Sequence, residues 1–201
     1  NMHQTEQKRY SKTTALVLCG IFAALMAICS FITIPLGFTP VPINLATLGV
    51  FLTGGILGKK YGSISLIVYI LLGAVGVPVF AGFKGGLGVL AGPTGGYIIG
   101  YLAAAFLTGL LVELVFTKTG TDSGQRSAKS STSRFIGIIL AMIAGLAACY
   151  ALGTAWFMIS TGTGLGAALI SCVIPFLPGD AAKIIVGALL VQKLRPAIPI
   201  R

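Results

Sequence analysis

The residues best suited to chemistry are an acid and a base, Asp180 and Lys183, three positions apart in an apolar part of the chain. Pro175, Pro178 and Gly179 interrupt the chain just before or beside them, and an apolar run follows. The carboxylate is therefore expected in the first turn of a helix, where the helix dipole stabilises an anion, with the lysine on the same face. Because ionisable groups are costly among apolar helices, the pair predicts a substrate site. The alternative is an aspartate that caps the helix beside a lysine that extends to the membrane interface.

The composition indicates a helical membrane protein. Hydrophobic residues make up 56% of the 201 residues, mean hydropathy is +0.98 and 9% of the residues are charged, whereas soluble domains carry about 25% charged residues. The apolar runs are continuous rather than alternating, which favours spanning helices over a β-barrel. The net charge of +10 comes from basic residues between these runs, a pattern typical of membrane topology rather than of nucleic-acid binding.

Few residues are suited to metal or nucleophilic chemistry. The only histidine, His3, lies in the polar N-terminal stretch, which leaves no basis for a histidine triad or a zinc site. Four cysteines in apolar surroundings, without a Cys-x-x-Cys pair, are interpreted as packing residues: Cys19, Cys29, Cys149 and Cys172. We therefore expect no metal, no bound cofactor and no catalytic residues.

The chain is expected to form a single membrane domain, residues 1–201, with an all-α bundle of six transmembrane helices at 13–195 between tails at 1–12 and 196–201. The predicted spans are 13–34, 44–58, 61–77, 97–116, 135–160 and 180–194, with a short non-spanning helix at 167–173. Basic residues concentrate in both tails, in the turn at 59–60 and in a flexible loop at 117–134. This asymmetry places both termini in the cytoplasm.

Two of the predicted spans, 44–58 and 180–194, are short for a bilayer. Each has about 15 residues and so extends about 22 Å, against a hydrocarbon thickness of about 30 Å. The missing length falls on the outward side, where irregular backbone must line a cavity or be covered by protein. We therefore predict an outward-facing pocket roofed by loops, with the proline-rich loop 35–43 as its lid.

A glycine-rich stretch at 76–97 is a second candidate element of this pocket. Its glycines permit close approach of backbone to a ligand, and it supplies possible wall residues and one hydroxyl: Phe80, Phe83, Tyr97 and Thr94. The alternative is a connector rich in hinges. The single tryptophan, Trp156, is either a further pocket wall or an interface anchor. No phosphate-binding loop is present, because neither Lys84 nor Lys59 stands in the required glycine and hydroxyl context.

The first predicted helix carries a stripe of small residues that lets another helix approach closely: Ala15, Cys19, Ala23 and Ala27. Internal packing explains most such stripes, but this one extends along the whole helix, which makes it the best candidate for docking a partner. Glu113, near the end of the fourth predicted helix and five residues before Lys118, is expected to pair locally or to extend to the interface. A proton relay would need a second acid at depth, and Asp180 is predicted at the opposite face.

Three stretches in this order resemble the BioY family, the biotin-specific S-components of energy-coupling factor transporters. They are residues 40–48 (Pro-Val-Pro-Ile-Asn-Leu-Ala-Thr-Leu), the glycine-rich stretch, and Pro175 to Lys183, and the resemblance covers nearly the whole chain. It implies capture of biotin from outside, a transmembrane T-component and two cytoplasmic ABC-type ATPases as partners, and no enzymatic activity in this chain. It also implies that Ala23 and Ala27 match a docking motif for the T-component.

Biotin has a ureido group, an apolar thiophane ring and a carboxylate tail. In the site that the resemblance implies, Asp180 accepts a ureido N–H, and Lys183 donates to the ureido carbonyl or to the carboxylate. Asn44 and Thr47 supplement these bonds, and Phe80, Phe83, Tyr97 and Trp156 enclose the rings. Two other classes remain open: a stand-alone secondary transporter of biotin or a related vitamin, and a membrane enzyme, for which no nucleophile or paired carboxylates are visible.

Overall fold

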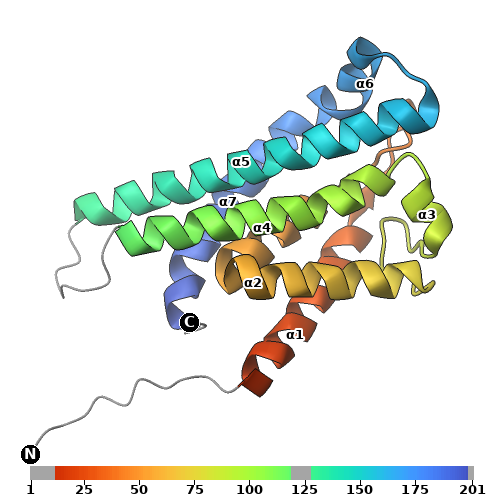
Figure 1. The fold of residues 1–201 in the computed structure, drawn as a ribbon. Helices are drawn as coiled ribbons and strands as arrows, with labels where there is room; N and C mark the ends of the chain where they lie inside the picture. Colours follow the sequence, from red (N-terminus) through yellow and green to blue (C-terminus); the bar gives the residue numbers. More distant parts are fainter. Residues whose placement is uncertain (1–11, 119–127, 199–201) are drawn as a thin grey trace, which may run out of the picture.

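The computed structural model describes residues 12–118 and 128–198, which fold into a bundle of long helices (Figure 1). Five helices in this part of the chain are long and apolar enough to cross a membrane. They are α1 (Lys12–Phe31), α2 (Ala46–Ala74), α4 (Gly95–Lys118), α5 (Ala128–Thr161) and the segment Leu165–Ala197, whose longest helix is α7 (Leu177–Leu194). The predicted all-α architecture is therefore confirmed.

Helix α2 combines the predicted helices 44–58 and 61–77, and its backbone is not helical at Gly58, where φ is 78° and ψ is −179°. Only glycine adopts such a conformation readily. A Cβ built on Gly62 would lie 3.0 Å from the Thr53 carbonyl oxygen and 3.1 Å from the Gly54 Cα atom. Residues eight apart in a straight helix are about 12 Å apart. The chain therefore folds back at Gly58, and the two halves of α2 pack side by side.

Small residues hold the helices close together. A Cβ on Gly100 of α4 would lie 3.1 Å from the Cys149 carbonyl oxygen of α5, and one on Gly145 of α5 would lie 2.9 Å from the Ala104 carbonyl oxygen of α4. Helix α4 packs against both α5 and α2, and α1 packs against α2. Such contacts are possible only where side chains are small.

The small stripe of α1 faces this interior. Ala23 and Ala27 are 4% and 9% exposed and belong to the core that α1 forms with its neighbours, and the Cys19 thiol donates to the Tyr61 carbonyl of α2. In this structure Ala23 and Ala27 therefore pack within the chain, and their expected role in docking a partner stays a prediction. The exposed side of α1 includes Gly20 and Ala24 instead.

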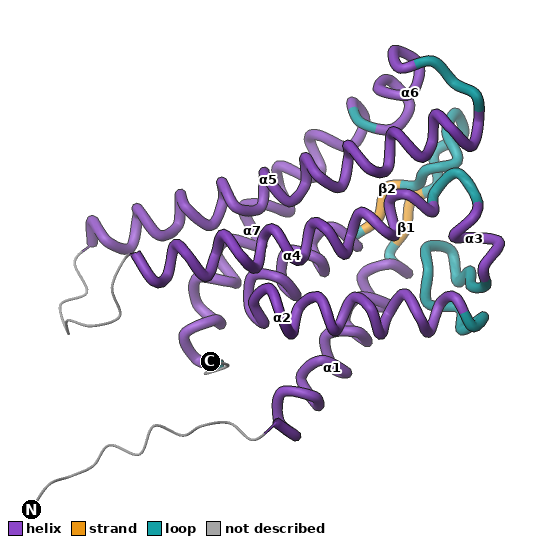
Figure 2. Tube along the Cα trace, viewed as in Figure 1, coloured by secondary structure: helices purple, strands orange, loops and turns teal. Residues whose placement is uncertain are grey.

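One end of the bundle, here called the loop end, gathers the short elements (Figure 2). Strands β1 (Thr33–Ile34) and β2 (Ile43–Asn44) pair antiparallel at the base of the proline-rich loop. Helix α3 (Leu87–Ala91) lies within the glycine-rich stretch, which is therefore more ordered than a simple connector. Helix α6 (Leu165–Cys172) confirms the predicted short helix, and the 3₁₀ turns η1 (Ile174–Phe176) and η2 (Arg195–Ala197) flank α7.

The opposite end carries the Gly58 turn and the facing ends of α4 and α5. Helix α5 begins at Ala128, so part of the loop predicted at 117–134 is helical, while residues 119–127 lie outside the described residues. Glu113 of α4 accepts a hydrogen bond from the Lys59 backbone N–H at 3.0 Å, so its contact lies 54 positions away in the sequence rather than next to it.

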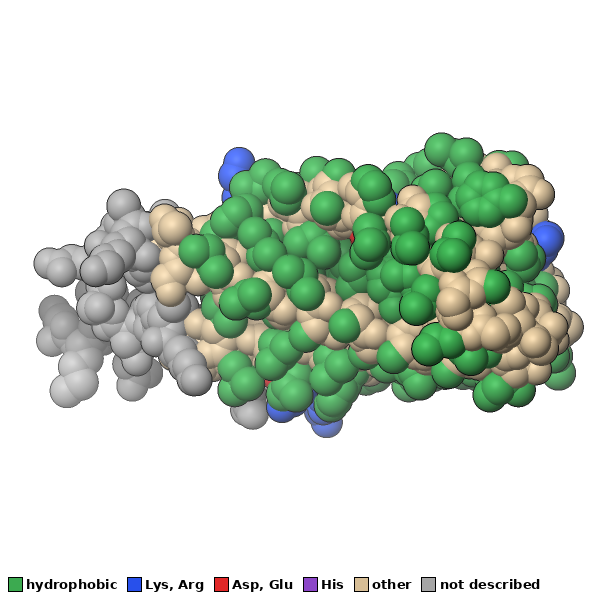
Figure 3. Space-filling view, turned by 90° about the horizontal axis from the view of Figure 1, so that it is seen from above, with side chains coloured by type: hydrophobic (Ala, Val, Ile, Leu, Met, Phe, Trp, Pro, Cys, Tyr) green, Lys and Arg blue, Asp and Glu red, His purple; other side chains and the backbone are tan. Residues whose placement is uncertain are grey.

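Apolar side chains cover most of the face seen in Figure 3. Many large ones are exposed between the two ends of the bundle, such as Leu140 at 60% and Ile143 at 47%. A surface of this kind is stable in hydrocarbon and not in water. The protein is therefore a multi-pass membrane protein.

Candidate functional site

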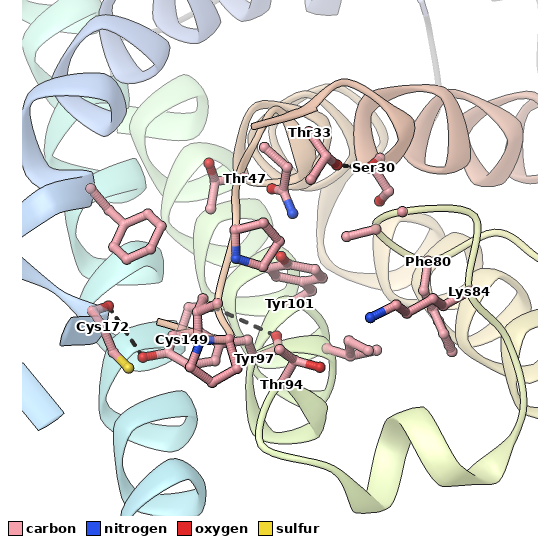
Figure 4. A pocket seen from close by; sticks show the side chains of 18 of the residues that line it. Ser30, Thr33, Thr47, Phe80, Lys84, Thr94, Tyr97, Tyr101, Cys149 and Cys172 are labelled. Atoms are coloured by element: carbon pink, nitrogen blue, oxygen red, sulfur yellow. Dashed lines mark hydrogen bonds between the residues drawn. The ribbon is translucent and has the colours of Figure 1, made fainter. Parts of the chain in front are cut away.

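A cavity of about 480 Å³ opens at the loop end and is lined by α1, α2, α4, α5, α6, α7 and the stretch 80–84. Its volume falls within the range of about 300–1,000 Å³ that is typical of small-molecule sites. Most of the lining is apolar, and a few polar groups converge on it, several of which Figure 4 shows. This is the combination expected of a site that encloses a small, partly apolar molecule.

The most polar part of the wall is the Asp180 cluster, which we define as Asp180, Lys183, Thr47 and Tyr150. Asp180 Oδ1 accepts from Lys183 Nζ at 2.8 Å and from Thr47 Oγ1 at 3.0 Å, and Oδ2 accepts from the Tyr150 hydroxyl. Lys183 also donates to Thr47 Oγ1 at 3.1 Å. The acid and the base are only 2% and 9% exposed. Each buried charge is thus both paired and hydrogen-bonded, as burial requires.

Two helix N-termini converge on the cluster. Helix α7 has a proline in its first turn and carries Asp180 there, as the sequence predicted. Thr47 is in the first turn of α2, whose start is shaped by Asn44, because the Asn44 Oδ1 atom accepts from the Ala46 N–H at 3.0 Å. Asn44 itself also lines the cavity. The positive ends of two helix dipoles therefore favour the Asp180 carboxylate.

Sequence reasoning missed Tyr150, although a signal for it exists. Four of the six tyrosines line the cavity: Tyr69, Tyr97, Tyr101 and Tyr150. A tyrosine in an apolar span needs a hydrogen-bond partner for its hydroxyl. Leu146, Cys149 and Tyr150 follow the i, i+3, i+4 spacing of one helix face and all line the cavity. A search for tyrosines on such faces would have found this residue.

The predicted aromatic wall residues of the glycine-rich stretch do line the cavity. Phe80 packs edge-on against Tyr69, with ring centroids 5.5 Å apart, and lies so close to Gly73 that no Cβ would fit there. Phe83 stacks on Phe31 of α1 at 4.4 Å. These contacts fix the stretch against α1 and α2, so this wall is formed without a ligand.

Tyr97 and Thr94 form the neighbouring wall at the start of α4. The Tyr97 hydroxyl donates to the Cys172 carbonyl of α6 at 3.2 Å and lies 3.3 Å from Thr154 Oγ1 of α5. The Thr94 carbonyl accepts the Tyr97 backbone N–H at 3.1 Å, while the residue itself lines the cavity. Tyr97 thereby connects α4, α5 and α6 at the loop end.

Trp156 is the one predicted substrate-binding residue that does not line the cavity. It is 37% exposed, and its indole N–H donates to the Gly92 carbonyl at 3.0 Å. Of the two roles expected for it, this position fits the interface anchor and not the pocket wall.

The other eight residues predicted to bind the substrate are brought together around one cavity: Asp180, Lys183, Asn44, Thr47, Phe80, Phe83, Thr94 and Tyr97. Within residues 12–118 and 128–198, no three His, Cys, Asp or Glu side chains are grouped to hold a metal ion.

Comparison with known proteins gives one consistent result. The biotin transporter BioY of Thermotoga maritima is 39% identical over 181 residues, covering 90% of this chain and 95% of that protein. The biotin transporter BioY of Rhizobium etli is 36% identical over 189 residues, covering 94% of this chain and 96% of that one. The crystal structure of the S-component for biotin from an ECF-type ABC transporter matches with a TM-score of 0.77 at 32% identity, over 92% of each chain. The sequence profile of the BioY family matches residues 2–200, and the chain therefore belongs to the BioY family.

Proposed function

We propose that the chain captures biotin from outside the cell as the substrate-binding S-component of an ECF-type transporter. The observation that carries the proposal is the Asp180 cluster, which holds a buried, hydrogen-bonded acid–base pair on the wall of a cavity of about 480 Å³. The proteins it resembles include biotin transporters and an S-component for biotin, which supports the same ligand.

The hydrogen-bonding capacity left in the cluster matches a ureido group. A carboxylate offers about four lone-pair positions, and three of those on Asp180 are already used. The remaining position, on Oδ2, would accept one ureido N–H. The Lys183 ammonium group has three N–H donors, and two of them are used by Asp180 and Thr47. The third N–H, together with the Asn44 amide, would donate to the ureido carbonyl.

The rest of the cavity suits the apolar body of biotin. Phe80, Phe83 and Tyr97 would enclose the thiophane ring, and Thr94 adds one hydroxyl. Nanomolar capture corresponds to about −12 kcal/mol. A ligand of this size reaches such values only in a preformed, well-enclosed pocket, and the contacts that fix Phe80 and Phe83 before binding supply that preorganisation.

The orientation follows from the charges and the reversal at Gly58. If each half of α2 spans the membrane, the five long helices give six spans, with Lys59 and Lys60 at the turn between two of them. The positive-inside rule then places this turn and both termini in the cytoplasm. The cavity faces outward, and the loop 35–43, whose Thr39 and Val41 are buried against the site, acts as its lid.

A transmembrane T-component and two cytoplasmic ABC-type ATPases would complete the transporter. ATP hydrolysis then takes place on the partners, and this chain needs no cofactor of its own. The exposed side of α1 is our candidate for T-component contact, because Gly20 and Ala24 leave room for a helix to approach. Leucine at both positions should block assembly and leave biotin affinity unchanged, because nothing lies within 4 Å of a Cβ at Gly20.

The test is titration of the purified, biotin-free chain in lipid nanodiscs with biotin and, as controls, with thiamine and riboflavin. Saturable binding is expected for biotin and not for thiamine or riboflavin. The proposal would be refuted if biotin showed no saturable binding. Uptake into liposomes separates the capture subunit from a stand-alone secondary transporter. A capture subunit transports only with its partners and ATP, whereas a secondary transporter would transport alone under an ion gradient.

A further inference from the structure

A second lysine lines the cavity apart from the Asp180 cluster. Lys84 lies on the glycine-rich stretch, is exposed, and directs its ammonium group toward the middle of the cavity from the side opposite Thr47 (Figure 4). Three charged residues occur in the cavity lining, and two of them, Asp180 and Lys183, neutralise each other at 2.8 Å. In the described part of the chain Lys84 forms no ion pair. The formal charge of the lining is therefore +1.

The position of Lys84 is fixed by its loop. The Lys84 carbonyl accepts from the Phe80 N–H at 2.9 Å, and this bridge closes a tight turn. Within the turn, Phe83 adopts φ of 57°, which is uncommon for a residue other than glycine, and its ring stacks on Phe31. A further bond joins the Gly86 N–H to the Gly73 carbonyl. The lysine thus projects from a stretch that is held at both ends before a ligand arrives.

We propose that Lys84 is the carboxylate contact of this site, so that a small monoanion binds with its neutral polar head at the Asp180 cluster and its carboxylate at Lys84. This assignment rests on the proposed function and deepens it. Electrostatics disfavours the reverse orientation, because Asp180 already neutralises Lys183 and a ligand carboxylate there would lie beside a like charge in a nearly dry environment. At Lys84 the carboxylate meets an unpaired cation and keeps part of its hydration.

The assignment also predicts which ligand changes the site tolerates. The head group lies against the buried, mutually bonded Asp180 and Lys183, so a change in the ureido group leaves buried polar groups without partners. The tail ends beside an exposed lysine, so loss of the tail charge removes one contact only. Changes in the ureido group should therefore abolish binding, whereas changes in the carboxylate should weaken it only in part.

The test compares biotin with biotinamide, which has the same shape and no charge, on the full chain in nanodiscs. In the parent protein biotin should bind about tenfold more tightly than biotinamide, because only biotin forms the charge-assisted contact with Lys84. In K84M the affinity for biotin should fall about tenfold and that for biotinamide by less than about twofold, so that the preference disappears. K84R should retain the preference, and high salt should reduce it in the parent protein.

Lys60→Met is the matched control, because Lys60 lies at the Gly58 turn and outside the cavity lining. It should leave both affinities unchanged. The inference is overturned if K84M weakens both ligands equally, if it weakens neither, or if the parent protein binds both ligands alike. Failure of the proposed function itself gives a different result, because the parent protein would then bind neither biotin nor biotinamide.

Discussion

Two acid–lysine pairs lie at opposite ends of this bundle and share little beyond their chemistry. At the loop end, Lys183 and Asp180 are 2.8 Å apart, with side chains 10% and 3% exposed. At the other end, Lys59 and Glu113 are 3.7 Å apart, with side chains 46% and 33% exposed. Exposed pairs at such distances contribute about 0–1 kcal/mol, whereas a buried pair cannot lose one partner without stranding the other.

The two carboxylates also differ in the groups that surround them. Asp180 also accepts from two hydroxyl groups and faces the cavity. Glu113 instead accepts from the Lys59 backbone N–H at 3.0 Å and occupies the space beside Gly58 where a Cβ would otherwise lie. The first pair is arranged around an opening for a ligand, and the second satisfies a backbone donor at a chain reversal.

An acid and a lysine in an apolar sequence are therefore not in themselves a site. Burial, hydroxyl partners and an adjacent cavity distinguish the functional pair from the structural one. Changing the same chemical group in each pair tests this distinction directly.

The largest effect is expected for D180N. Asparagine keeps the size of the side chain but leaves Lys183 buried at 9% exposure without a counter-charge, so biotin affinity should fall at least about 100-fold. Calorimetric titration measures this change. E113Q is the matched control, because it makes the same carboxylate-to-amide change in the other pair. An affinity for D180N within about threefold of the parent protein would contradict the assignment.

A smaller effect is expected for Y150F, which removes the hydroxyl that donates to Asp180 Oδ2 and keeps the ring. A hydrogen bond to a charged group contributes about 1.5–3 kcal/mol, so biotin affinity should fall about tenfold or more. Tyr61, whose ring packs beside Lys60 outside the cavity lining, gives the matched control Y61F. Equal losses for the two variants would mean that Tyr150 acts through general stability rather than through the cluster.

The local features of this chain could be predicted from sequence. Helix α6 and the entry of Asp180 into the first turn of α7 follow from glycine and proline breaks beside apolar runs. Eight of the nine residues predicted to bind the substrate also line the cavity, because the stretches that contain them are too polar or too irregular to face lipid. These arguments depend on neighbours in sequence and need no knowledge of tertiary contacts.

The features that sequence did not yield depend on which helix faces which. Tyr150 joins Asp180 across 30 positions, and Glu113 joins Lys59 across 54. Ala23 and Ala27 carry the right pattern for docking, but the rotation of α1 buries them. Spacing alone fixes neither the rotation of a helix nor its partner in a bundle where every face is apolar.

The smallest effect on binding is expected at the second pair, and it separates the charge of Glu113 from its hydrogen bond. E113Q keeps an oxygen that accepts from the Lys59 N–H, so it should leave both biotin affinity and the melting temperature nearly unchanged. E113A removes the acceptor, at a cost of about 1 kcal/mol by analogy with a lost helix cap, or about 2–4 °C. Thermal unfolding in nanodiscs and titration with biotin measure the two quantities. If E113Q instead lowered biotin affinity about tenfold, the two ends of the bundle would be energetically coupled, and the division between a binding pair and a structural pair would no longer hold.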